Sequence, residues 1–162
     1  MTQTDNRMMK NNPNNIEKFK ITGKVFIWAY PENKNNYPGW NFTADKRACD
    51  ELYQLLTLMD QYDWTSLKTI STSLPGQRQL NAVNIKAPWK SKTRLTLKCK
   101  KTADENYWQI IKHADELEIV FGKNKLIELQ KAIKGIPKNE GDFAITDEND
   151  NNFLYIWWNL EN

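Results

Sequence analysis

The apolar segment near the C-terminus restricts the fold more than any other part of the chain. It reads Phe153-Leu154-Tyr155-Ile156-Trp157-Trp158. In a strand, successive side chains point to opposite faces, so residues 153, 155 and 157 form one aromatic row and three apolar residues lie opposite. A strand exposed to water on one face would alternate apolar with polar residues. The segment therefore predicts a strand inside a sheet that is covered on both faces.

A second segment, residues 24–30, has the same two-sided apolar pattern. Its aromatic row is Phe26, Trp28 and Tyr30, with Val25, Ile27 and Ala29 opposite. We expect the two segments to be close neighbours in one sheet. If the rows share a face, six rings lie on it. Either the protein's own helices cover that face as core, or it forms a groove for a ligand or partner.

Two amphipathic helices are predicted from apolar residues at three- and four-residue spacing. The first runs from about residue 44 to 60, with Thr43 as cap and Asp45 in its first turn, and the second from about 125 to 134, with Asn124 as cap. Strands are expected at 20–30, at 67–73 as an edge strand, and at 93–100, 107–111 and 116–121. A hairpin is expected to join 142–146 to 153–159.

The order of these segments predicts a single α+β domain over residues 20–162, preceded by a disordered or loosely held N-terminal arm over residues 1–19. Its mostly antiparallel sheet would have about six to seven strands, with two helices packed on it. The chain has 162 residues, of which 40% are hydrophobic, enough for one domain with a sizeable core.

Several common sites and targeting signals find no support in the sequence. No apolar run approaches the ~20 residues of a membrane span, and residues 1–15 lack a signal-peptide core. Cys49 and Cys99 are in no Cys-x-x-Cys spacing, so we expect buried free thiols, a reducing compartment and a cytoplasmic location. The single histidine, His113, is expected at the surface or at a strand end, so no metal site is expected.

No catalytic residue, metal site or cofactor is predicted. The six glycines do not form a phosphate-binding motif. Asp147, Asn149 and Asn151 imitate the first ligands of a calcium loop, but Asn152 occupies the position that needs glycine, and Trp158 the position that needs glutamate. A solvated hairpin turn is the better interpretation, and the chain is not expected to be an enzyme.

The charge distribution is the feature that bears most directly on function. Between Asp63 and Asp104 there are nine basic and no acidic residues, so residues 64–103 carry +9 and the rest of the chain −6, although the net charge is only +3. Such an asymmetry affects partner choice and association rate. The alternative is a face of lysines that is only solvated.

Two functional classes follow. In the first, the chain is a small non-catalytic protein-binding module, such as an immunity or inhibitor-type protein that neutralises a toxin or enzyme through a basic, aromatic-containing surface with affinity for an acidic protein. In the second, residues 64–103 bind nucleic acid, with bases stacked on Trp89. The candidate binding residues are Lys86, Trp89, Lys90, Lys92, Arg94, Lys98, Lys100 and Lys101.

Overall fold

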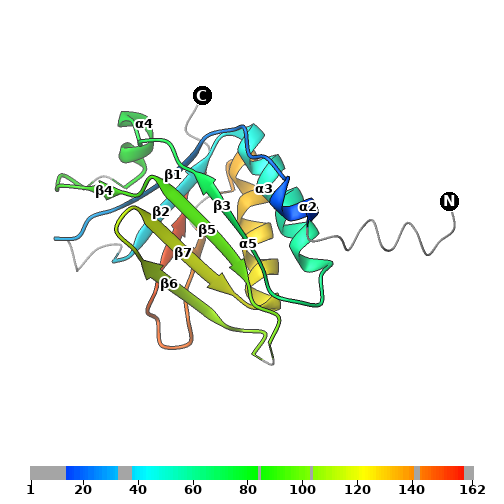
Figure 1. Ribbon diagram of the computed structural model, residues 1–162. Coiled ribbons are helices and arrows are strands. Elements are labelled where there is room, and N and C mark those ends of the chain that lie inside the picture. The colour runs from blue at the N-terminus through cyan, green and yellow to red at the C-terminus, as the bar shows by residue number, and fades with distance from the viewer. Residues whose placement is uncertain (1–13, 33–37, 84, 103, 141–142, 159–162) are drawn as a thin grey trace, which may run out of the picture.

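The computed structural model contains two β-sheets with helices packed beside them (Figure 1). It describes residues 14–32, 38–83, 85–102, 104–140 and 143–158. Sheet A has the order β4-β1-β2-β9-β8 and sheet B the order β3-β5-β7-β6. The strands of sheet A are β1 Val25–Ala29, β2 Trp40–Ala44, β4 Lys90–Ser91, β8 Phe143–Ile145 and β9 Leu154–Ile156. Those of sheet B are β3 Ser66–Ser71, β5 Arg94–Cys99, β6 Trp108–Lys112 and β7 Glu116–Phe121.

Two long helices, α3 and α5, pack against each other and against the sheets (Figure 1). Their bounds are α3 Lys46–Asp60 and α5 Lys123–Gly135. Shorter helical turns are α2 Asn14–Glu17, α4 Gln77–Leu80, and the 3₁₀ turns η1 Asn81–Val83 and η2 Ile136–Lys138. The predicted α+β class is therefore confirmed. The helices α3 and α5 lie where two amphipathic helices were predicted, but the described residues also contain the short helices α2 and α4, which were not predicted.

The main core is shared by both sheets and the α3–α5 pair. Leu52 and Leu55 of α3, Leu95 of β5, Leu117 of β7 and Leu154 of β9 are all fully buried in it. The sheets meet at one corner, where Ser73 N donates to Val25 O at 2.8 Å. Apolar side chains from segments far apart in the sequence thus form one continuous core.

The opposite face of sheet A carries the aromatic rows, and they do share this face. Phe26, Trp28, Tyr30 and Trp157 are buried there in a second cluster. The cover comes from the end of α4, the η1 turn and residues 85–87 rather than from a long helix. The rings along the last strand follow one another, with centroids 5.5 Å apart for Phe153 and Tyr155 and 6.4 Å apart for Tyr155 and Trp157. Of the two alternatives for this face, core or groove, most of it is therefore core, although long helices do not cover it.

Buried polar groups of β2 lie between the two aromatic rows. The Asn41 side chain is fully buried, accepting from Trp157 Nε1 at 2.9 Å and donating to Trp28 O at 3.3 Å. Thr43 Oγ1 donates to Trp157 O at 3.0 Å. Each group is buried with a hydrogen-bond partner, so β2 joins the first and last strands at little desolvation cost.

The prediction of a single sheet of six to seven strands is wrong, because the nine described strands form two sheets. Sequence reasoning missed β2 and the short β4. Strand β2 separates β1 from β9, which are therefore not direct neighbours. Five of the strand pairings are antiparallel, whereas β2–β9 and β5–β7 are parallel. The chain between the parallel strands β5 and β7 passes through β6, and α5 connects β7 of sheet B to β8 of sheet A.

Both predicted helix caps are also wrong. Asp45 caps α3, since its Oδ1 accepts from Ala48 N at 2.8 Å, while Thr43 belongs to β2. Gly122 precedes α5 as its cap, and Asn124 lies within the helix. Of the arm predicted over residues 1–19, residues 1–13 lie outside the described part, and α2 follows with Ile16 buried in the main core.

Asp147 organises the turn between β8 and β9. Its carboxylate accepts from Asn149 N, Asn151 N and Asn152 Nδ2 at 3.1, 2.7 and 2.8 Å. The hydrogen bonds from Asn151 and Asn152 hold the pKa of Asp147 below its ordinary value. The predicted hairpin with a solvated turn is therefore confirmed, and Asn152 connects the turn to sheet B.

We predict that Trp157→Ala lowers the free energy of unfolding by ~3–5 kcal/mol, because the change empties a buried site and leaves Asn41 Oδ1 unpaired. Trp64→Ala is the matched control, since 44% of Trp64 is exposed, and we expect it to cost under ~1 kcal/mol. Denaturant unfolding measures both. A loss below ~1 kcal/mol for Trp157→Ala would contradict its role as core.

We predict a pH-dependent effect for Asp147→Asn. A lowered carboxyl pKa contributes stability above the unfolded-state pKa, and this contribution is lost as pH falls through the folded-state pKa. The variant should therefore be less stable than the wild type at pH ~7, and this difference should shrink below pH ~4. Thermal unfolding at both pH values measures this stability difference. A difference that does not change with pH would contradict the lowered pKa of Asp147.

Candidate binding surface

The predicted binding residues do not form one patch, and the first group lies beside sheet A. Lys86 and Trp89 line a hollow of about 500 Å³ next to Tyr30, and Lys90 follows in β4. Trp89 is 36% exposed. Burial raises the pKa of Tyr30, and the interaction with the Trp28 side chain lowers it by a smaller amount. This group brings an exposed ring and two ammonium groups together at one end of sheet A.

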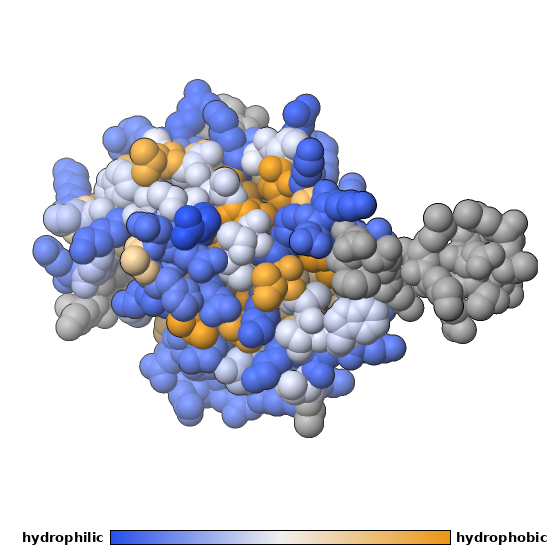
Figure 2. Space-filling view, in the orientation of Figure 1, coloured by the Kyte–Doolittle hydropathy of each residue, from blue (hydrophilic) through white to orange (hydrophobic). Residues whose placement is uncertain are grey.

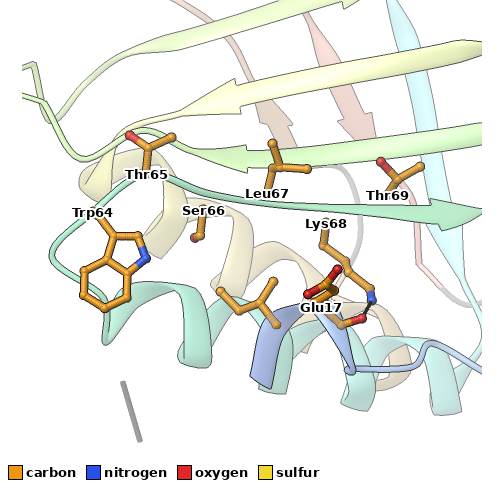
Figure 3. Close-up of a pocket in the computed structure, with 8 residues that line it drawn as sticks. Glu17, Trp64, Thr65, Ser66, Leu67, Lys68 and Thr69 are labelled. Carbon is orange, nitrogen blue, oxygen red and sulfur yellow. Dashed lines mark hydrogen bonds between the residues drawn. The ribbon is translucent and has the colours of Figure 1, made fainter. Parts of the chain in front are cut away.

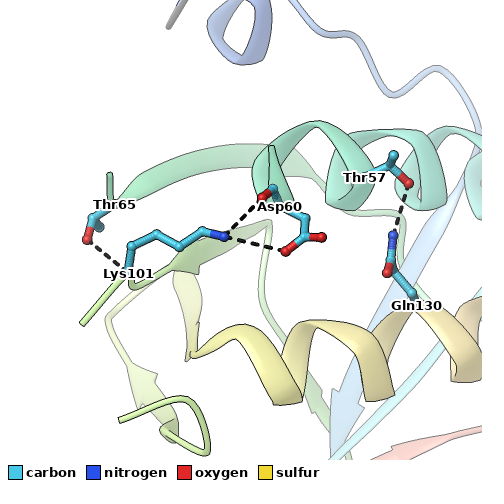
Figure 4. Close-up of polar contacts among 5 residues, drawn as sticks. All are labelled: Thr57, Asp60, Thr65, Lys101 and Gln130. Carbon is cyan, nitrogen blue, oxygen red and sulfur yellow. Dashed lines mark hydrogen bonds and ion pairs between the residues drawn. The ribbon is translucent and has the colours of Figure 1, made fainter. Parts of the chain in front are cut away.

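A second group makes contacts within the protein. Lys92 Nζ donates to His113 O at 2.7 Å and to Ala114 O at 3.0 Å. Lys101 Nζ donates to the backbone and the carboxylate of Asp60, as Figure 4 shows, at 3.1 and 3.4 Å. Lys100 Nζ lies 4.7 Å from the centre of the Tyr107 ring. These cations help to hold the fold together, so a partner would have to compete for them.

Arg94 and Lys98 form the third group, on the face of sheet B that points away from the core. The parallel pairing of β5 with β7 places Glu116 beside Arg94 and Glu118 beside Thr96. The Thr96 hydroxyl also hydrogen-bonds the Glu116 carboxylate. Neither cation forms an ion pair with a described residue. The basic row of β5 thus lies next to an acidic row from outside residues 64–103.

The four sheet edges differ in how they are protected from pairing with another strand. In sheet A, the edge strands β4 and β8 are only two and three residues long. In sheet B, Asn152 covers the β6 edge, where its carbonyl accepts from Trp108 Nε1 at 2.7 Å and its side chain from Ile110 N at 3.3 Å. The predicted edge strand is confirmed as β3, which is six residues long.

The backbone of β3 leaves alternate residues without a partner on the open side. Thr72 N donates to Thr93 O, towards β5, whereas Ser73 N donates in the opposite direction to Val25 O. By alternation, the N–H and C=O groups of Leu67, Thr69 and Ser71 point away from β5. Among the described residues, none of these groups has a backbone partner. They form an open edge available for hydrogen bonding.

A groove of about 360 Å³ runs along this edge and is bounded by α2 (Figure 3). Ser66 and Lys68 point towards the helices, while Leu67 and Thr69 point to the other side of the strand. Lys68 Nζ donates to Glu17 O at 2.7 Å, which ties α2 to β3. The groove is thus a fixed feature built by the strand, the short helix and their contact.

The groove has exposed apolar side chains and one unsatisfied polar group. Leu67 is 54% exposed, and Trp64 stacks on buried Tyr62 with ring centroids 4.9 Å apart. Ser66 is 9% exposed, and its Oγ has no hydrogen-bond partner among the described residues. Figure 2 shows hydrophobic residues among hydrophilic ones where β3 crosses this face. The Ser66 hydroxyl is itself buried, so what a bound segment would cover is the exposed apolar area beside the open strand edge.

Reactive side chains are not gathered at this groove. Cys49 and Cys99 are buried free thiols, as predicted, and burial raises the pKa of Cys99. His113 is exposed at the end of β6, with Nε2 3.4 Å from Glu118 Oε1. Nowhere in the described ranges do three His, Cys, Asp or Glu side chains come together as they would around a metal ion. No helix in these ranges is long and apolar enough to span a membrane.

Comparison of the chain with models of protein families, with curated proteins and with solved structures found no match.

Sequence reasoning missed most of the groove residues. It predicted an edge strand over residues 67–73, and it assigned neither Trp64 nor Ser66 to an element. The one usable signal was the polar, β-branched composition of residues 67–73, whose weak amphipathicity suggests an edge strand. The groove itself could not be found, because Ile16 and Glu17 reach it from a distant part of the chain.

We predict that amide hydrogens along β3 exchange in two classes. Lys68 and Ile70 donate within the ladder and should be protected, whereas Leu67, Thr69 and Ser71 should exchange faster by at least about tenfold. Hydrogen exchange followed by NMR measures this, with Ile110 of the covered β6 edge as a protected control. Equal protection of all five β3 amides would show that another segment covers this edge.

Proposed function

We propose that the chain is a non-catalytic protein-binding module, and that the open β3 edge with its groove is the central part of the interface. The observation that carries this proposal is the combination of a long unpaired edge with exposed Leu67 and Trp64 beside it. Natural proteins usually block long edge strands, so an open one in a well-packed domain favours a binding role. Tryptophan is also enriched among the residues that dominate interface energies.

Arg94 and Lys98 would form the charged rim of this interface. They lie on β5, directly next to the open strand, and no described carboxylate pairs with them. Rim charges raise the association rate and favour partners of opposite sign. The proposed partner is therefore a protein with an acidic surface. An immunity or inhibitor-type role, in which binding neutralises a toxin or enzyme in the cytoplasm, is the specific version that we propose.

A nucleic-acid-binding role is the second candidate, and the exposed Trp89 beside Lys86 and Lys90 is the observation that favours it. The arrangement of sheet B argues against it. Glu116 and Glu118 lie next to the basic row of β5 and would repel phosphates. Lys92 and Lys101 are already bound within the protein. The protein-binding proposal therefore has the stronger support.

We predict that the double variant Arg94→Glu/Lys98→Glu loses its protein partner. Tagged full-length protein would be recovered from its native cells, and the amount of co-purified partner compared between variants. The double variant should recover at least about tenfold less than the wild type, because charge reversal at the rim repels an acidic surface. Lys123→Glu/Lys131→Glu, an exposed pair on α5, is the matched control and should recover partner normally.

The same purification separates the two candidates. A nucleic acid recovered with the wild type, with binding that falls steeply as salt rises, would favour the second one. Equal loss of partner in the double variant and the α5 control would show a general charge effect and contradict the proposed interface. Recovery of neither protein nor nucleic acid with the wild type would overturn both proposals.

A further inference from the structure

We propose that the partner contributes an extended segment that pairs with β3 as an additional strand, with acidic side chains at two outward positions four residues apart. This inference rests on the proposed protein-binding function and specifies its mode. The backbone of the edge, the groove on the inner side and the charges on the outer side each support this binding mode.

The backbone supplies the main attraction. Leu67, Thr69 and Ser71 each present one N–H and one C=O to the open side, so a segment of about five residues matches the edge. Strand addition to an exposed edge obtains affinity from such main-chain hydrogen bonds and specificity from alternate side chains. At its end the edge is closed, because Ser73 pairs with β1. The length of the site is therefore defined.

The groove would receive the inward side chains of the added strand. Its wall contains the Trp64 ring, and buried Ile16 lies beside it. An aliphatic side chain would extend this apolar surface. The inner positions of the segment are thus expected to be apolar, such as valine.

The charges on the outer side define the outward positions. The β3–β5 register places Leu67 beside Lys98, Thr69 beside Thr96, and Ser71 beside Arg94. An added strand lies about 10 Å from β5, two strand spacings away, within reach of long basic side chains. Acidic residues opposite Leu67 and Ser71 would therefore meet Lys98 and Arg94. The central position faces Thr96, which already bonds Glu116, so a neutral residue fits there.

A second copy of this chain fits the edge less well. Pairing of β3 with its own copy would bring Lys68 close to the partner copy's Lys68 on the inner face. The Arg94 and Lys98 rows of both copies would also share one outer face, without new acidic partners. Like charges in such positions destabilise a sheet. An acidic segment from another protein satisfies the same backbone groups without this repulsion.

The test uses two blocked synthetic peptides with the full-length protein. The first is Ser-Glu-Val-Thr-Val-Glu-Ser, and the second replaces both glutamates with lysine. NMR titration at millimolar concentration should move the amide signals of Leu67, Thr69 and Ser71 with the first peptide. The second peptide should bind at least about tenfold more weakly. Arg94→Glu/Lys98→Glu should reverse this preference, because it reverses the charge of the row.

A backbone variant tests strand addition separately from charge. Thr69→Pro removes an outward N–H that the ladder does not use, a position at which edge strands accept proline. Thr69→Ala is the matched control, since it also loses the Thr69–Thr96 hydroxyl contact but keeps the N–H. Peptide binding should fall at least about tenfold in Thr69→Pro and stay near the wild-type value in Thr69→Ala.

The outcomes are distinguishable. No movement of the three amide signals with either peptide would overturn strand addition, whether or not Thr69→Pro folds. Equal binding of both peptides would overturn the acidic preference. Concentration-dependent dimerisation that protects the same amides would replace the partner with a second copy. Co-purified partner that survives Thr69→Pro but not Arg94→Glu/Lys98→Glu would leave the proposed function standing and reject only this binding mode.

Discussion

The apolar character of sheet A on both faces is the constraint on which the other parts of the structure depend. Every residue of β1 and β2 is buried, so each face of this sheet needs a cover. The α3–α5 pair and sheet B cover one face, and residues 80–83 and 85–87 cover the aromatic face. Burial of several large rings contributes most of the stabilisation that offsets chain entropy. Segments that looked like loops are therefore required as core.

Sheet B is covered on one face only, and this difference explains where binding is proposed. Its outer face carries the side chains of Arg94 and Lys98 next to Glu116, which suits contact with water and with charged partners. Its β6 edge is covered by Asn152, whereas no described backbone group pairs with the open side of β3. The same asymmetry leaves Leu67 exposed on a rigid strand. Binding groups on rigid elements are preorganised, which lowers the cost of association.

Local patterns allowed correct prediction of the elements whose apolar residues repeat regularly. The stripe along α3, the alternation of β5 and the bounds of β7 follow from side-chain period, and the edge position of β3 from its polar, β-branched composition. β2 was missed because Asn41 and Thr43 are polar and yet buried, satisfied by Trp157 and Trp28 from other strands. The cap of α3 was predicted wrongly for the same reason. Thr43 belongs to β2, and the cap is Asp45.

By itself, the sequence determined the α+β class, the two helices, the buried thiols and the excess of basic residues in one stretch. These depend on composition and on the spacing of neighbouring residues, which the chain carries locally. Only the tertiary structure decided that there are two sheets, that Glu116 lies beside Arg94, and that Ile16 borders the groove below β3. Such contacts join residues far apart in the chain. They arise from strand pairing and from shared burial, which no local pattern specifies.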